Sequence, residues 1–143
     1  MGQIETSEPA LKDLLSHVGL LLLKWGQMEH AMRGVVGGSS GLTAASRQGK
    51  ALVDAWREIA GARASGDVRR CAEISRVATE LETLRPLRNL VCHGIQAANS
   101  EPFAGRPPGL HCWLEDEETV VSWDDLDDAI RRLEGVSGAF FRR

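Results

Sequence analysis

One ten-residue stretch, 85–94, brings together the side chains of this chain that could act on a phosphate. It contains Arg85, Arg88, Asn89 and His93, and it ends at Gly94. On a helix, Arg85, Asn89 and His93 are spaced by four residues and share one face, with Arg88 on a flanking row. Guanidinium groups stay charged and bind phosphate oxygens in pairs, and histidine exchanges a proton near neutral pH. The stretch therefore predicts a site for anion or phosphate chemistry.

An apolar face beside these polar residues would hold the stretch to a core. Leu84, Leu87 and Val91 recur at helical spacing. Pro86 removes one backbone donor and disfavours the helical conformation at Arg85. Either one long helix kinks at this proline, or a new helix begins with the proline in its first turn. Both alternatives place the polar residues on a helix, and the sequence leaves the choice open.

A carboxylate interrupts the apolar face of the first predicted helix. Glu29 occupies a position where the spacing of apolar residues calls for another apolar side chain. A buried carboxylate is costly unless it is paired. Glu29 either lies at the edge of the apolar face and reaches water, or it is buried and pairs with Arg85, Arg88 or His93. We favour the second interpretation, because those cations require a counter-ion.

Hydrophobic periodicity predicts an all-α helical bundle of four to five helices in a single domain over 1–143. The expected core helices cover about 8–36, 43–63, 67–97 and 122–140. A short β-hairpin over about 110–121 is expected just before the last helix, with acidic residues at its turn. Asp67 is expected to cap the third helix, and Ser122 with Asp125 forms a capping box for the last one.

The composition limits the classes of function. A net charge of −3 argues against a protein that coats nucleic acid non-specifically. The three cysteines have no paired spacing, which favours a reduced, cytoplasmic setting. The longest apolar run, Val18 to Leu23, is too short for a membrane span, and no signal peptide is evident, so no membrane association is expected.

The run RNLVCH, from Arg88 to His93, resembles the Arg-x4–6-His signature of the HEPN superfamily. These are small all-α proteins, many of which are RNA-cutting toxins or effectors. Asn89 fits the polar residue that typically follows the arginine, and the long first helix with Glu29 fits the setting. The resemblance covers the helical core, about residues 8–97 and 122–140, and the hairpin looks like an embellishment of some bacterial members.

The resemblance implies a metal-independent endoribonuclease, plausible as a bacterial toxin or defence effector. Arg88, His93 and Asn89 would be the catalytic residues, and Arg85 and Glu29 would bind substrate or support the site. His93 would act as general base or general acid. No cofactor and no metal are implied. The expected partners are RNA or a nucleotide, a second copy of the chain, and an antitoxin-like protein.

Helix geometry also favours a homodimer. Five residues turn an ideal helix through about 500°, so the side chains of Arg88 and His93 project roughly 140° apart. A two-fold interface would bring the arginine of one copy near the histidine of the other. HEPN relatives pair in this manner, so the resemblance points to the same arrangement.

Other interpretations remain open. The fold could be a non-catalytic HEPN-like module that binds a nucleotide, RNA or protein, or a dimeric helical scaffold. His93 followed by Gly94 could simply cap a helix end. The pairs Cys92-His93 and His111-Cys112 weakly suggest zinc, although adjacent residues rarely reach one tetrahedral ion.

Overall fold

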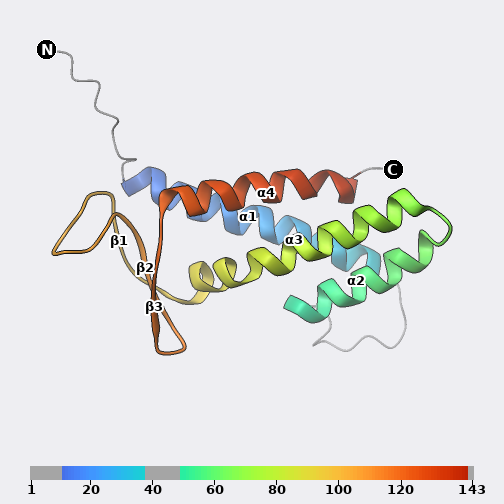
Figure 1. The fold of residues 1–143 in the computed structure, drawn as a ribbon, viewed down its shortest axis with the longest axis horizontal. Helices are drawn as coiled ribbons and strands as arrows, with labels where there is room; N and C mark the ends of the chain where they lie inside the picture. Colours follow the sequence, from blue (N-terminus) through green and yellow to red (C-terminus); the bar gives the residue numbers. More distant parts are fainter. Residues whose placement is uncertain (1–10, 38–48, 142–143) are drawn as a thin grey trace, which may run out of the picture. The chain divides into compact units, whose positions relative to one another are not determined.

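The computed structural model describes residues 11–37 and 49–141, and the expected helix starts at 8–10 and 43–48 lie outside these described residues. The chain is predominantly helical, with a small antiparallel sheet (Figure 1). In chain order the elements are α1 (Leu11–Val36), α2 (Gly49–Arg63), α3 (Val68–His93), β1 (Ile95–Asn99), β2 (Gly109–Leu114), β3 (Glu117–Val121) and α4 (Trp123–Phe141). Among the described helices, none combines the length and the apolar character that a membrane span requires.

The described chain divides into two compact units, and each is built from segments that are distant in sequence. We call 11–22 and 86–130 the sheet unit, because it contains all three strands. We call 23–37, 49–85 and 131–141 the helical unit. Each of the helices α1, α3 and α4 is divided between the two units. The expectation of a single domain stays a prediction.

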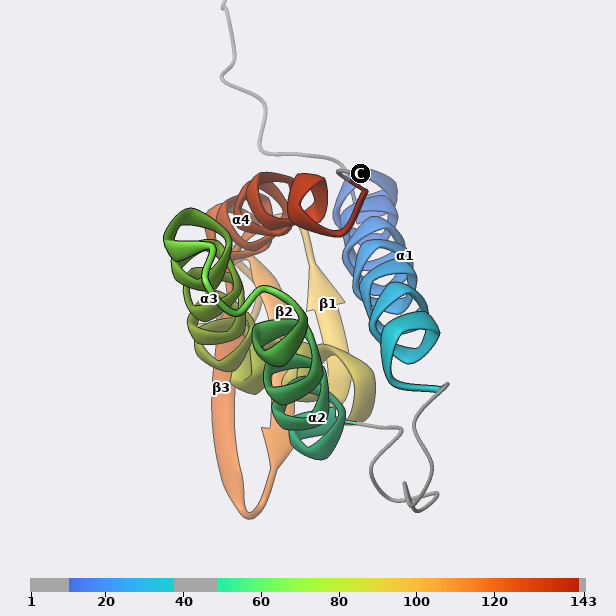
Figure 2. The same ribbon diagram turned by 90° about the vertical axis from the view of Figure 1, so that its right-hand side faces the viewer.

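The predicted hairpin is present and forms the larger part of the sheet. Strand β2 pairs with β3 antiparallel, with Leu114 opposite Glu117, so Glu115 and Asp116 make a two-residue turn. Both turn residues have positive φ, at 54° and 61°. Such a pair defines the type I′ turn that matches the right-handed twist of a hairpin. The strands lie side by side in the order β1-β2-β3 (Figure 2).

Strand β1 corrects the all-α prediction, which placed residues up to about 97 on a helix. Helix α3 ends at His93, and the chain from Ile95 onward pairs antiparallel with β2, from Ile95 opposite Cys112 to Asn99 opposite Gly109. The register shifts between Ile95 and Ala97, as at a β-bulge. The pairing partner lies more than ten residues away, so local periodicity could not reveal this strand.

Helix α3 runs without interruption through Pro86, which settles the choice that the sequence left open. Proline is tolerated here at the loss of one backbone hydrogen bond. The apolar face predicted around it is present, since Leu84 and Val91 are buried and Leu87 is half-buried. The polar residues from Arg85 to His93 therefore lie on one continuous helix.

The predicted caps are also present. Asp67 Oδ1 accepts a hydrogen bond of 3.0 Å from the backbone N–H of Arg70 at the start of α3. Ser122 and Asp125 form the reciprocal capping box at the start of α4, with side chain to backbone distances of 3.0 and 3.1 Å. These bonds satisfy N–H groups that helix starts leave without intrahelical partners.

Each unit has its own buried apolar residues. In the sheet unit they come from every element except β1 and include Leu14, Leu21, Val91, Leu110, Cys112, Val121 and Leu126. In the helical unit they include Trp25, Met28, Met32, Leu52, Trp56, Ile74, Val77, Leu81 and Leu133. The ring of Trp56 also packs against that of Phe140, with centroids 5.0 Å apart.

Candidate functional site

The last turns of α3 carry the three side chains predicted to be catalytic. Arg88 Nη1 donates a hydrogen bond of 3.2 Å to Asn89 Oδ1. Both side chains are half-buried, whereas His93 is exposed at the end of the helix. The amide of Asn89 thus restrains the guanidinium, while the imidazole can meet a ligand from solvent. The structure places all three within the sheet unit.

A close backbone approach fixes the end of this helix against the sheet. The N–H of Gly94 donates to the carbonyl of Leu90 at 2.8 Å, and its carbonyl accepts from the N–H of Trp113 in β2 at 2.7 Å. A Cβ atom at Gly94 would lie 3.0 Å from Leu90 O and 3.2 Å from Trp113 O. Glycine therefore allows helix and strand to approach, and the bond to β2 holds the turn that carries His93.

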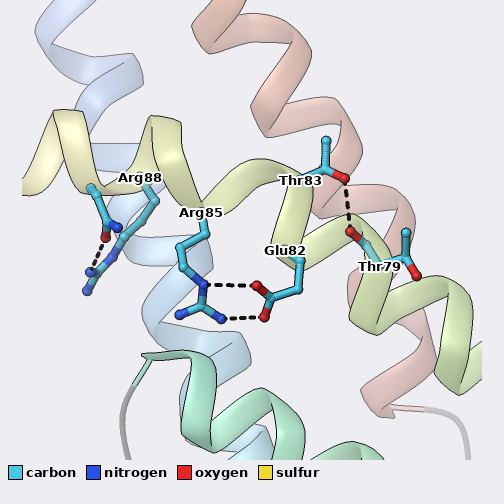
Figure 3. A network of polar contacts seen from close by, with 6 residues as sticks. Thr79, Glu82, Thr83, Arg85 and Arg88 are labelled. Carbon is cyan, nitrogen blue, oxygen red and sulfur yellow. Dashed lines mark hydrogen bonds and ion pairs between the residues drawn. The ribbon is translucent and has the colours of Figure 1, made fainter.

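Arg85, predicted as a supporting residue, already has a counter-ion on its own helix. Its Nη2 lies 2.7 Å from Glu82 Oε1, and its Nε lies 3.4 Å from Glu82 Oε2. Figure 3 shows the two side chains facing each other, with Arg88 further along α3. The Arg85 side chain is 16% exposed. Glu82 was not identified from the sequence as the partner of Arg85. A spacing of three residues between a glutamate and an arginine on a helix could have indicated this ion pair.

Glu29, in the helical unit, is buried as predicted, with a relative exposure of 8%. Its Oε2 lies 3.8 Å from Nη2 of Arg33, one turn further along α1. This partner also was not foreseen, although the spacing of four residues allows it. The predicted pairing of Glu29 with Arg85, Arg88 or His93 stays a prediction.

The cysteine and histidine pairs do not form a metal centre in the described part of the chain, where no group of three or more metal-ligating side chains occurs. Cys92 and His93 are exposed on the last turn of α3. His111 and Cys112 are adjacent on β2, so their side chains point to opposite faces of the sheet. Burial raises the pKa of the Cys112 thiol, which disfavours the thiolate that zinc requires.

No protein family model matches the chain, and no curated protein or solved structure matches it either. Function must therefore be inferred from the candidate residues and their geometry. They comprise a restrained guanidinium, a neighbouring amide and an exposed imidazole on the last two turns of one helix. Such a set can bind a phosphate, neutralise charge that develops on it, and exchange protons with it.

Proposed function

We propose that the chain is a metal-independent endoribonuclease of the HEPN type, with Arg88 and His93 at its cleavage site. The observation that carries the proposal is the arrangement at the end of α3. A half-buried arginine, held by Asn89, and an exposed histidine lie on the same continuous helix, five residues apart. This is the spacing of the Arg-x4–6-His signature, on the secondary structure that the signature requires.

The proposed reaction moves one phosphate between two oxygens of the same RNA strand. The 2′-hydroxyl loses its proton to a base and attacks the adjacent phosphorus, and the P–O5′ bond breaks. The 5′ oxygen leaves with a proton from an acid, so the products end in a 2′,3′-cyclic phosphate and a 5′-hydroxyl. His93 serves as the base or the acid, because histidine is the side chain that most often transfers protons in catalysis and this one reaches solvent.

Arg88 stabilises the negative charge of the phosphorane. A guanidinium stays charged at all relevant pH values and offers paired N–H donors to phosphate oxygens. Its bond to Asn89 fixes one of these donors, which reduces the reorganisation that phosphate binding would need. Arg85 holds a neighbouring phosphate in this scheme, with part of its charge offset by Glu82.

The proposed working unit is a homodimer in which the motif of one copy meets that of the other. On the continuous helix α3, the side chains of Arg88 and His93 project roughly 140° apart, so one chain alone aims them in different directions. A two-fold axis places an arginine beside a histidine of the partner. As a biological setting we propose a bacterial toxin or defence effector in the cytoplasm, controlled by an antitoxin-like protein.

Cleavage of total RNA in the presence of EDTA tests the proposed function. The wild-type protein should cut RNA with chelator present, and its rate should vary with pH between about 6 and 8. The products should resist end-labelling at their 3′ side until the cyclic phosphate is opened and removed. His93→Ala should abolish cleavage, and His30→Ala, which removes another exposed histidine, should not.

Two results would contradict this proposal. Activity that disappears with chelator and returns with a divalent ion would place the chemistry at another site. Intact RNA under all conditions, with binding retained, would instead support the non-catalytic module that binds RNA or a nucleotide.

A further inference from the structure

A cavity of about 340 Å³ opens on the sheet, and its lining includes none of the side chains assigned to cleavage. Its volume lies at the lower end of the range for small-molecule sites, so it suits one compact ligand. The residues that line it are Gln96, Arg106, His111, Cys112, Trp113 and Glu118. All of them belong to the sheet unit. The lining therefore combines a cation, an anion, an amide and two aromatic rings.

The strand pairing places Trp113 and Glu118 on one face of the sheet. They are directly opposite each other in the β2–β3 ladder, and opposed residues project to the same side. Trp113 is 49% exposed, although tryptophan is normally well buried. Glu118 is exposed as well. This face thus offers a flat aromatic surface with a carboxylate beside it.

His111 contributes a buried acceptor to the same cavity. It lies two residues before Trp113 and so shares its face, yet it is only 2% exposed. Its Nε2 lies 3.1 Å from the carbonyl of Pro107, which can only accept, so Nε2 is the donor of this hydrogen bond, and in the neutral imidazole Nδ1 is an acceptor. This Nδ1 is buried and has no hydrogen-bond partner among the described residues. A buried polar atom without a partner, in a residue that lines the cavity, is available for a hydrogen bond to a ligand.

We propose that this cavity binds a guanine base, either in a free nucleotide or in an RNA strand. The exposed ring of Trp113 stacks on the base, as aromatic side chains do on unpaired bases. The carboxylate of Glu118 accepts from N1–H and from the N2 amino group, two adjacent donors on the same edge. Adenine presents an acceptor at N1, cytosine an acceptor at N3, and uracil a single donor between two carbonyls. A carboxylate therefore selects guanine.

The cavity is connected to the candidate cleavage site through the backbone. The N–H of Trp113 donates to the carbonyl of Gly94, and Gly94 follows His93 directly. Arg106 at the cavity supplies a positive charge for the phosphate of the bound nucleotide. A guanine held here would direct cleavage to the neighbouring phosphate. That consequence rests on the proposed function, whereas guanine binding itself does not.

Titration with 5′-GMP and 5′-AMP, followed by tryptophan fluorescence and calorimetry, tests the proposal. Wild type should bind GMP at least about tenfold more tightly than AMP, which is the discrimination expected of a bidentate contact. Glu118→Gln should reduce this preference by about tenfold. Trp113→Ala should weaken GMP binding by about tenfold, measured by calorimetry because the fluorophore is lost. Glu117→Gln is the matched control, since Glu117 is adjacent on β3 and its side chain lies on the other face.

The RNA oligonucleotides UUGUU and UUAUU identify the source of the base. Tighter binding of UUGUU than of GMP indicates a guanine within a strand, and GMP binding without any preference for UUGUU indicates a free nucleotide. Equal affinity of the wild-type protein for GMP and AMP overturns the proposal. This comparison does not depend on whether the variants fold. His93→Ala should keep its GMP affinity, so loss of cleavage with intact binding contradicts only the proposed function. Cleavage without GMP binding contradicts only this inference.

Discussion

Arg88 can be tested more sharply by lysine than by alanine. Lysine keeps the positive charge, but it cannot present two parallel N–H donors to a phosphate or keep the same bond to Asn89. We expect Arg88→Lys to lower kcat/KM for RNA by at least about 10²-fold, because an oriented donor to the developing charge is lost. Arg69→Ala removes an exposed arginine near the start of the same helix and should leave the rate unchanged.

Cys112 should make the stability of the fold depend on alkaline pH. Burial raises the pKa of its thiol above the ordinary value of 9.0. The unfolded chain therefore releases this proton before the folded chain does, so the free energy of unfolding is unaffected well below pH 9 and decreases as pH rises above it. Urea unfolding between pH 7.5 and 10 measures the slope, and the chain contains no tyrosine that would titrate nearby.

The control for this prediction is the exposed Cys92. Cys112→Ala should flatten the decrease of stability with pH, even if it lowers stability overall, while Cys92→Ala should keep the full slope. A wild-type slope that survives Cys112→Ala would show that another group causes it.

The sequence predicted the position and burial of individual residues wherever these depend on spacing along one helix. The positions of Arg88, Asn89 and His93 on the end of a helix and the burial of Glu29 followed from periodicity. The counter-ion of Arg85 was harder to foresee. Glu82 lies at a favourable spacing, but many exposed pairs at this spacing contribute little, so spacing alone does not single it out.

At the scale of elements, the contact between α3 and β2 depends on Gly94. Its substitution by alanine puts a Cβ within 3.0–3.2 Å of two backbone oxygens, which cannot move without disturbing the helix end or the strand. We expect Gly94→Ala to lower the free energy of unfolding by about 1–3 kcal/mol and to reduce RNA cleavage. The matched control is Gly26→Ala in α1, where an added Cβ meets no atom within 4 Å, and which should raise stability by about 0.5–1 kcal/mol.

The hairpin turn between β2 and β3 is built from residues that resist its geometry. Glu115 and Asp116 both have positive φ, a conformation that costs ordinary L-residues roughly 1–2 kcal/mol. The double substitution Glu115→Asn and Asp116→Gly should therefore raise the free energy of unfolding by about 1 kcal/mol, since Asn-Gly is the preferred type I′ pair. Thermal unfolding measures the gain. Asp116→Ala removes the charge but keeps the Cβ, so it should not raise the free energy of unfolding. If it raised stability as much as the double substitution does, the loss of charge and not the backbone conformation would be responsible.

The elements that local sequence could predict are the helices and the hairpin, because their signals lie within a few residues. Strand β1 was missed because its five residues, IQAAN, show no clear alternation and are ordered by pairing with β2. The continuity of α3 through Pro86 could not be predicted from local sequence either, because a proline can lie within a kinked helix or in the first turn of a new one.

At the scale of the whole molecule, the proposed composite site can be tested by mixing inactive chains. Arg88→Ala and His93→Ala proteins should each be inactive, and mixing them should restore up to about one quarter of wild-type activity per chain, because half of the random dimers contain one intact pair of residues. Light scattering at micromolar concentration measures the assembly. An active protein that remains monomeric at all concentrations would rule out the composite site.

Sequence could not reveal the two compact units. Each unit joins segments separated by more than forty residues, and the helices α1, α3 and α4 contribute to both. Linkers and composition shifts mark domain boundaries only where each domain is one continuous segment of the chain. The cavity on the sheet was missed for a related reason, since Gln96, Arg106 and Glu118 come from β1, from the loop after it and from β3, and no local motif joins them.

Strand β3 lies at one edge of the sheet, and it begins with Glu117 and Glu118 directly after the acidic turn. An open edge invites strands of other molecules to add, which is a common beginning of aggregation. If two copies approached each other along β3, they would set rows of carboxylates face to face, and this repulsion counteracts addition. The acidic start of β3 thus disfavours the addition of a second copy at this edge of the sheet.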